Sequence, residues 1–172
     1  MSQQLQDMKK IIVDKVVINI GVGKSGEPIE KAKKALLELT GQHPAVRGAK
    51  KTIRDFGIHK GEPIGAIVTL RRDTAIEFLK RVIAAKKNVL KMSSFDNYGN
   101  ISLGIHEHID IPGTKYNPDI GIFGMDVNVV LSRPGYRIAR KSRKSARIGK
   151  THRINKEDAI EFFKHEYGAG VE

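Results

Sequence analysis

The chain contains no cysteine and no tryptophan, and aromatic residues make up only 6% of its 172 positions. Without cysteine it forms neither a disulfide nor a thiolate zinc site, so its stability has to come from an ordinary hydrophobic core. No apolar run approaches the roughly 18 residues that would cross a bilayer. The N-terminal sequence MSQQLQDMKK has no apolar segment of the kind found in signal peptides. These absences predict a cytoplasmic protein that does not span a membrane.

Acidic residues are scarce relative to basic ones. The chain holds 31 lysines and arginines against 19 aspartates and glutamates, which gives a formal net charge of +12 and a sequence pI of about 9.9. Such a charge selects partners rather than a fold, and a polyanion is the natural partner: nucleic acid first, an anionic membrane surface second. Because 40% of the residues are hydrophobic, a real core is available, and we expect residues 1–172 to form a single domain.

Hydrophobic periodicity predicts the order strand, helix, strand, helix, strand, strand, helix. Alternating apolar residues place the strands at 11–23, 64–71, about 101–109 and 124–132. Residues 45–61 are polar and basic, and we interpret them as a strand edge followed by a projecting loop at about 50–63. The order predicts an α+β fold, in which helices pack on one face of a curved, mostly antiparallel sheet and the other face stays open.

Start and stop signals delimit the helices. Pro28 suits the first turn of the first helix, and Gly41 lies where that helix would end. Asp73 or Thr74 starts the second helix, and Asn155 caps the last one. The apolar stripe expected on the second helix is Ile76, Leu79 and Ile83, widened by Phe78 and Val82.

Each predicted strand has one apolar face and one face of small or polar residues. The second faces hold Asn19, Gly21 and Gly23; Thr69 and Arg71; Ser102, Gly104, His106 and His108; and Asp126 and Asn128. An ordinary solvated face is the alternative, because antiparallel sheets usually expose one side to water. Solvated faces favour long charged side chains, however, whereas this one holds short amides, hydroxyls and glycines. A flat surface that hydrogen-bonds at close range suits the backbone and minor groove of folded RNA.

The stretch 133–153, called the basic tract below, has no acidic residue. Its cations are Arg133, Arg137, Arg140, Lys141, Arg143, Lys144, Arg147, Lys150 and Arg153. Subtracting these nine charges from +12 leaves +3 for the rest of the chain. Like charges repel unless a polyanion neutralises them, so we predict that the tract contacts RNA phosphates. A solubilising disordered arm and a localisation signal are the alternatives. We also expect the tract to be largely mobile when free, and Tyr136 to stack on a base.

Residues 21–26, GVGKSG, match G-x-G-x-x-G after a strand and before a helix. A dinucleotide site also needs an acidic residue at the end of a second parallel strand, but Glu38 falls inside the predicted helix. A P-loop needs glycine at position 18, which is Ile18. A nucleotide-dependent enzyme is therefore a disfavoured alternative. We interpret the turn as a phosphate-binding segment whose phosphate belongs to RNA.

The rest of the sequence gives little support for a catalytic site or a metal site. His106 and His108 lie on one face of a predicted strand, as metal ligands do, but no third ligand accompanies them. Contact with phosphate or a base, or plain exposure, is the preferred interpretation. No nucleophile, base and acid occur at a suitable spacing, and no carboxylate pair indicates hydrolysis. The sequence therefore predicts no enzyme activity, no metal and no cofactor.

Four stretches carry a resemblance to a known family. They are KVVINIGVG at 15–23, LTGQHPAVRGAKKTI at 39–53, FGIHKGEPIGAIVTLR at 56–71 and FDNYGNISLGIHEHI at 95–109. In this order they resemble the universal large-subunit ribosomal protein family "L-five" over nearly the whole chain. The segment at 133–163 resembles the archaeal and eukaryotic branch, since bacterial members lack this basic insertion.

The resemblance implies a structural constituent of the large ribosomal subunit that binds 5S rRNA in the central protuberance. It also implies contacts with 23S rRNA, the peptidyl-site tRNA and neighbouring ribosomal proteins, including a small-subunit protein at the intersubunit bridge. The family's 5S rRNA contacts fall on Asn19, Gln42 and Thr69, and the first and last of these lie on the polar strand faces. The full 5S rRNA surface that we predict is Asn19, Gly21, Gly23, Lys24, Gln42, Thr69, Arg71 and Ser102. The family's tRNA-contacting loop falls on about 50–63 and includes Lys51, Arg54, Phe56, His59 and Lys60.

The main alternative is a general nucleic-acid packaging protein in which the basic tract is the only functional part. That alternative predicts equal affinity for DNA and for any RNA. A ribosomal protein with a shaped surface should instead prefer one folded RNA.

Overall fold

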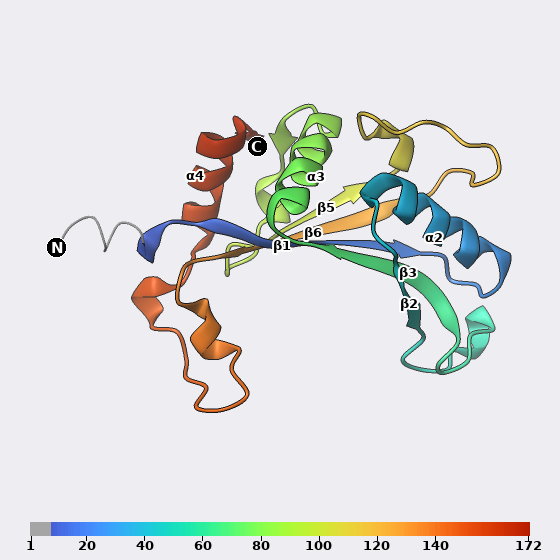
Figure 1. The fold of residues 1–172 in the computed structure, drawn as a ribbon, viewed down its shortest axis with the longest axis horizontal. Coiled ribbons are helices and arrows are strands. Elements are labelled where there is room, and N and C mark those ends of the chain that lie inside the picture. The colour runs from blue at the N-terminus through green and yellow to red at the C-terminus, as the bar shows by residue number, and fades with distance from the viewer. Residues whose placement is uncertain (1–7) are drawn as a thin grey trace.

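A computed structural model describes residues 8–172 of the chain (Figure 1). Residues 1–7, which form most of the stretch predicted to have no signal peptide, lie outside the described residues. The main sheet has five strands in the order β2-β3-β1-β6-β5, and every neighbouring pair is antiparallel. Its strands are β1 (Ile12–Gly21), β2 (Ala45–Gly48), β3 (Pro63–Leu70), β5 (Ile101–Ile105) and β6 (Met125–Ser132).

Strand β1 lies at the centre of the sheet, and its alternating residues separate the two faces. Val16, Ile18 and Ile20 are fully buried on one face. Ile18 is paired with Val68 of β3 on one side and Val127 of β6 on the other, and both partners are buried. A continuous apolar layer therefore runs across the middle of the sheet and needs a cover.

Helices provide that cover. They are α2 (Glu27–Thr40), α3 (Arg72–Ala85) and α4 (Lys156–Tyr167), and all three lie on one side of the sheet (Figure 1). Leu36, Leu79 and Phe163 bring them into the same core as the strands. α2 ends as predicted, because Gly41 adopts a left-handed conformation with φ of 68° and donates its N–H to the Leu37 carbonyl. The predicted α+β fold with a mostly antiparallel sheet is confirmed.

Some boundaries differ from the predictions. The strand expected at 101–109 ends at Ile105, because the chain turns into a 3-10 helix at His108–Asp110. The second helix starts at Arg72, slightly earlier than expected. Ile76 is 37% exposed, whereas Ala75 is fully buried, so the assignment of Ile76 to the apolar stripe is wrong. The other four residues of the expected stripe are buried, and the small Ala75 takes the place expected for Ile76.

A short parallel pair was not predicted. β4 (Val89–Leu90) pairs with β7 (Gly170–Val171) and ties the segment after α4 to the segment after α3. The Glu172 N–H donates to the Leu90 carbonyl at 3.0 Å, which extends the pairing. Strands of two residues are too short for periodicity to reveal them.

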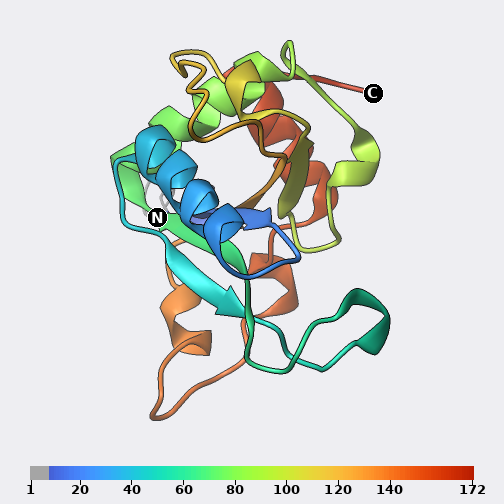
Figure 2. The ribbon, with the colours of Figure 1, turned by 90° about the vertical axis from the view of Figure 1, so that its right-hand side faces the viewer.

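Two segments project from the sheet on the side away from the helices (Figures 1 and 2): the loop 49–62 between β2 and β3, and the basic tract between β6 and α4. They leave opposite ends of β1. Gly21 is paired with Gly65 near the loop, and Ile12 is paired with Ser132 beside the tract. β1 has 10 residues, so roughly 30 Å of strand separates the two projections. The open sheet face thus lies in a recess between them.

The corrected stripe of α3 predicts unequal costs for two truncations on one helix. Leu79→Ala removes a fully buried side chain and should lower the free energy of unfolding by about 2–5 kcal/mol. Ile76→Ala should lower it by less than about 1 kcal/mol. Urea denaturation followed by circular dichroism measures both, and equal losses would contradict the packing of α3 described above.

Candidate nucleic-acid interface

The polar face of the sheet consists of residues that point away from the helices on neighbouring strands. The register places Thr69, Val17, Asn128 and Ser102 in one row, and Ile67, Asn19, Asp126 and Gly104 in the next. Thr69, Ser102 and Asp126 are exposed, whereas Asn19 and Asn128 are half-buried. The Ser102 hydroxyl donates to Asn128 Oδ1 at 2.8 Å, which holds these two side chains as a pair. The structure therefore brings Asn19, Thr69 and Ser102 onto one accessible surface.

A shallow hollow of about 470 Å³ opens at one end of this face, lined by Asn19, Gly21, Gly104, His106 and Asp126 among others. Asp126 is paired with Asn19 across β6 and β1, so a carboxylate stands beside an amide. A carboxylate repels phosphate and accepts hydrogen bonds from hydroxyl and amino groups. This part of the face suits ribose hydroxyls and base edges better than it suits phosphates.

Other predicted contacts lie around the edges. Gln42 is exposed in the bend after α2, outside the rows of the polar face, and its N–H donates to Thr40 Oγ1 at 3.3 Å. Arg71 is exposed immediately after β3, and Lys24 is exposed in the turn after β1. The structure thus assembles the strand residues of the predicted set and leaves Gln42 apart from them.

His108 is not on the polar face, and its assignment there is wrong. It is only 3% exposed, in the 3-10 helix after β5, and its Nδ1 accepts the backbone N–H of Phe123 at 3.2 Å. His106 is exposed, so the two imidazoles have different environments. Periodicity extended the strand too far, because a 3-10 turn after Ile105 leaves no signal in an alternating pattern.

The glycine-rich turn at 21–26 forms neither a dinucleotide site nor a P-loop. β1 is antiparallel to both neighbours, so the parallel β-α-β unit that such sites require does not form around it. The N–H groups of Val22 and Gly23 donate to the Ile64 carbonyl at 2.9 and 3.0 Å and are not free for a phosphate. Glutamates 27 and 30 occupy the first turn of α2, where negative charge opposes an anion. β1 thus lacks the parallel neighbour on which the nucleotide-enzyme alternative depended, and the turn offers the exposed Lys24 side chain to an anion.

The projecting loop 49–62 is a hairpin whose two arms are joined by backbone hydrogen bonds at its neck, where the loop leaves the sheet. Ala49 donates to the Glu62 carbonyl and accepts from the Gly61 N–H, both at 2.8 Å. A Cβ at Gly48 would lie 2.9 Å from the Gly61 carbonyl oxygen, so the neck admits no side chain there. Closer to the tip, Ile53 and Ile58 form an isolated antiparallel bridge.

The tip of the loop carries the predicted tRNA-contacting residues. These are Lys51, Arg54, Phe56, His59 and Lys60, and all of them are exposed. Phe56 is 72% exposed, an unusual position for a large aromatic side chain without a partner. The structure thus presents one aromatic ring and several cations together at the end of a hairpin.

Glu62 holds the base of this hairpin in place through two hydrogen bonds. Its Oε2 accepts the His59 N–H at 2.9 Å, and its Oε1 accepts the Ser25 hydroxyl at 2.7 Å. The His59 hydrogen bond first, and the Ser25 hydrogen bond second, hold the pKa of the Glu62 carboxyl below its ordinary value of 4.5. The carboxylate therefore joins the hairpin to the turn that follows β1.

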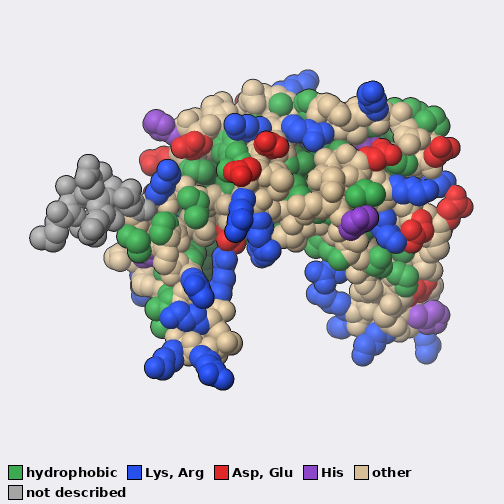
Figure 3. Space-filling view, viewed as in Figure 1, with side chains coloured by type: hydrophobic (Ala, Val, Ile, Leu, Met, Phe, Trp, Pro, Cys, Tyr) green, Lys and Arg blue, Asp and Glu red, His purple; other side chains and the backbone are tan. Residues whose placement is uncertain are grey.

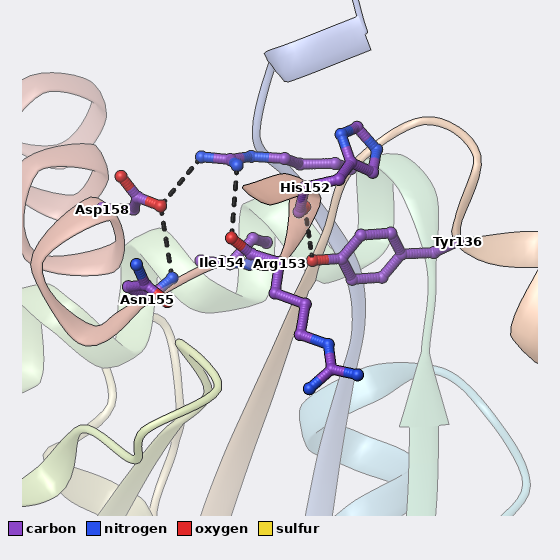
Figure 4. Close-up of polar contacts among 7 residues, drawn as sticks. Tyr136, His152, Arg153, Ile154, Asn155 and Asp158 are labelled. Atoms are coloured by element: carbon purple, nitrogen blue, oxygen red, sulfur yellow. Dashed lines mark hydrogen bonds and ion pairs between the residues drawn. The ribbon is translucent and has the colours of Figure 1, made fainter. Parts of the chain in front are cut away.

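The two ends of the basic tract meet at the start of α4 (Figure 4). The Ile154 N–H donates to the Tyr136 hydroxyl at 2.9 Å, and that hydroxyl donates to the His152 carbonyl at 3.2 Å. Arg133 donates to Asp158 Oδ2 at 2.9 Å and to the carbonyl of Arg153 at 3.3 Å. We call this group of contacts the clasp.

Most cations of the tract lie beyond the clasp and are exposed. They are Arg137, Arg140, Lys141, Arg143, Lys144, Arg147 and Lys150. Figure 3 shows lysine and arginine side chains gathered on both projections. Arg133 and Arg153 differ from the rest, because both are partly buried: Arg133 is bonded within the clasp, and the Arg153 side chain donates to the Ile148 carbonyl. Positive charge thus flanks the polar face at both ends of β1.

Within residues 8–172, no group of three histidine, aspartate or glutamate side chains is arranged to hold a metal ion. None of the helices formed by these residues has the length and apolar character needed to span a bilayer.

Fold and surface together define the class: a basic α+β protein whose accessible polar sheet face, set between cationic projections, is suited to nucleic acid. Comparison with protein families identifies the particular family. Residues 6–59 match the family described as "Ribosomal protein L5", and residues 63–162 match "ribosomal L5P family C-terminus". The chain therefore belongs to the ribosomal protein L5 family.

Curated relatives agree with this assignment. The chain is 53% identical to the "Large ribosomal subunit protein uL5" of Sulfolobus acidocaldarius over 95% of this chain and 92% of that protein. It is 51% identical to the protein of the same name from Nitrosopumilus maritimus over 99% of each, and 53% identical to that from Archaeoglobus fulgidus over 91% and 88%. These archaeal relatives confirm the predicted resemblance and its branch.

Sequence reasoning missed several residues that shape the interface. No sequence pattern marks Glu62, because its hydrogen-bond partners lie in a turn and a loop that only the fold brings together. Asp14 did give a signal, since it breaks the apolar strand pattern: the register of β1 against β6 shifts between Val13 and Lys15. Asp158 lies three residues after Asn155, a capping-box spacing that marks it as structural.

The lowered pKa of Glu62 predicts a pH-dependent hairpin base. Ionised Glu62 is favoured in the folded state, so its contribution should be complete above pH 4.5 and disappear as the pH falls through the lowered pKa. Glu62→Gln should reduce the protection of the His59 amide against hydrogen exchange at pH 7, and acidification should reduce it in the wild type. NMR-detected exchange, corrected for intrinsic rates, measures this protection. Glu161→Gln on α4 is the control. Equal protection of the His59 amide in the wild type, Glu62→Gln and Glu161→Gln would contradict this role of Glu62.

Proposed function

We propose that this ribosomal protein is a structural constituent of the large subunit in the cytoplasm, where it binds 5S rRNA through the polar face of its sheet. The observation that carries the proposal is the accessible set of short polar side chains on neighbouring strands, with α2, α3 and α4 on the opposite side of the sheet (Figure 1). A preformed flat surface reads RNA by shape and by its 2′-hydroxyls.

The chemistry of the face indicates which RNA groups it would meet. Asn19, Thr69 and Ser102 offer hydroxyl and amide groups, and Asp126 offers an acceptor for hydroxyl or amino protons. Gly21 is exposed at the end of β1, with open space where a Cβ would lie, so an RNA backbone can approach closely. We include Gly23, Lys24, Gln42 and Arg71 as contacts at the edge of the same surface.

Phosphates would be bound by the projections. The exposed cations of the basic tract would neutralise RNA phosphates, which makes affinity strongly dependent on salt. The family resemblance extends the proposal to 23S rRNA, and it assigns the tip of loop 49–62 to the peptidyl-site tRNA. Neighbouring ribosomal proteins, including a small-subunit protein at the intersubunit bridge, complete the proposed partners.

No reaction is part of this function. Ribosomal proteins of this family are structural components, and binding through preformed hydrogen bonds and ion pairs requires neither a catalytic residue nor a cofactor.

Removing the polar groups at the centre of the face should weaken 5S rRNA binding. Asn19→Ala and Thr69→Ala each delete one hydrogen-bonding group, at about 0.5–1.5 kcal/mol per bond lost. A filter-binding titration of the folded double variant measures the loss. Asn117→Ala and Thr114→Ala are matched controls, because those residues contact Glu38 of α2 and Arg81 of α3 on the other side of the sheet.

The same titration separates the proposal from a general packaging function. Competition by duplex DNA as effective as competition by unlabelled 5S rRNA would contradict the proposal, as would unchanged affinity of the Asn19/Thr69 double variant. Preference for 5S rRNA that falls in this variant would support a shaped surface.

Changes at the hairpin tip should separate two RNA partners. Arg54→Gln with Lys60→Gln removes two exposed charges far along the hairpin from the polar face, so 5S rRNA affinity should be retained. Occupancy of the peptidyl site by tRNA on reconstituted particles should fall. Lys34→Gln with Lys80→Gln, exposed on α2 and α3, removes equal charge elsewhere and should leave occupancy normal. Normal occupancy in the Arg54/Lys60 variant would show that the assignment of the hairpin is wrong.

A further inference from the structure

The basic tract is a closed loop whose ends are joined. It leaves β6 after Ser132 and rejoins the core at Ile154, which is 1% exposed. Between these points, residues 141–145 are all exposed. Whether such a loop is ordered before RNA arrives depends on the contacts at its base, and those contacts are specific.

Tyr136 is the first of them. Its hydroxyl both accepts from the Ile154 N–H and donates to the His152 carbonyl, so it bridges the two ends of the tract. The His152 ring packs edge-on against the Tyr136 ring with centroids 5.8 Å apart, and its Nε2 lies 2.8 Å from the Pro134 carbonyl oxygen. The tyrosine is partly buried within the clasp, which makes it a poor candidate for base stacking.

Arg133 is the second contact. Its side chain is only 10% exposed, and its guanidinium reaches the carbonyl of Arg153 and the carboxylate of Asp158. Asp158 also accepts the N–H of Asn155, so one carboxylate joins the arginine to the first turn of α4. A phosphate would have to displace these partners from an arginine whose own side chain is largely buried.

Arg140 gives the tract a further attachment. Its Nη1 lies 2.9 Å from Asp14 Oδ2, at the irregularity of β1 between Val13 and Lys15. The pair is partly exposed and contributes little by itself. It does tie the tract to β1 through a contact that is separate from the clasp.

We infer that Tyr136, Arg133 and Asp158 are positioning residues for RNA binding: they order the exposed cations of the tract before RNA is bound, without touching the RNA. The inference rests on the proposed function, in which those cations bind RNA phosphates. An ordered loop loses its conformational entropy on folding rather than on binding, which raises affinity without any added contact. This assignment replaces the expectations of a largely mobile tract, of base stacking by Tyr136 and of phosphate contact by Arg133.

Two substitutions distinguish ordering of the tract by the clasp from direct contact between these residues and RNA. Asp158→Asn raises the net charge of the protein by one, so simple attraction to a polyanion predicts tighter RNA binding, whereas loss of the clasp predicts weaker binding. Tyr136→Phe keeps an aromatic ring, so base stacking predicts unchanged binding, whereas loss of the bridging hydroxyl predicts weaker binding.

The experiment is a fluorescence-anisotropy titration of labelled 5S rRNA at several salt concentrations. We expect Tyr136→Phe and Asp158→Asn to bind about three- to ten-fold more weakly than wild type, with the slope of log affinity against log salt unchanged. Arg143→Gln with Lys144→Gln should lower both the affinity and the slope, the latter by about 0.7–0.9 per charge. Tyr116→Phe in an exposed loop and Glu161→Gln on α4 are matched controls and should not weaken binding.

A double-mutant cycle and hydrogen exchange complete the test. Arg133→Gln and Asp158→Asn together should cost less than the sum of their separate effects, and amides 137–147 of the free protein should exchange faster in Tyr136→Phe than in Tyr116→Phe. Binding and exchange equal to the controls would overturn the inference. If Arg143→Gln with Lys144→Gln leaves affinity and slope unchanged, the proposed phosphate contacts fail instead, and the exchange data still decide whether the clasp orders the tract.

Discussion

Burial of one face of β1 is the constraint on which the rest of the structure depends. Val16, Ile18 and Ile20 are fully buried beneath the helices, and their paired residues on β3 and β6 are buried with them. A slip of one residue would expose this apolar set and bury Asn19 without partners. The register is therefore strongly specified, and the same choice that builds the core leaves the small polar residues on the accessible side. The polar face is accessible because the apolar face of the same strands is buried in the core.

The interface divides its chemistry by position. Besides the partly exposed Val17 and Ile67, the polar face carries amides, hydroxyls, glycines and the carboxylate of Asp126, whereas positive charge is concentrated on the two projections (Figure 3). Direct hydrogen bonds are short-ranged and shape-dependent, while phosphate attraction is longer-ranged and screened by salt. In the proposed function, the cations of the projections attract an RNA and the sheet face discriminates among RNAs. That proposal requires projections with a defined direction. Glu62 joins the hairpin to the turn after β1, and the clasp joins the two ends of the basic tract.

Local signals in the sequence were sufficient for much of this architecture. The alternation at 11–23 predicted the central strand and its two faces, Gly41 predicted the end of α2, and Asn155 predicted the start of α4. Contacts between distant segments were not predictable, because no pattern links Arg133 to Asp158 or Ser25 to Glu62 before the fold is known. His108 was misplaced because alternation does not reveal where a strand gives way to a 3-10 turn. Membership of the family is confirmed, whereas the residue-level RNA contacts stay predictions.

The central claim is that the sheet face itself, and not only the cations, binds RNA. A cryo-microscopy map of the protein bound to 5S rRNA, at a resolution that shows side chains, tests it most directly. The account predicts RNA density against Asn19, Thr69 and Ser102, with phosphates close to the exposed arginines of the basic tract. RNA density confined to the tract, or lying over α2, α3 and α4 while the polar face stays empty, would contradict it.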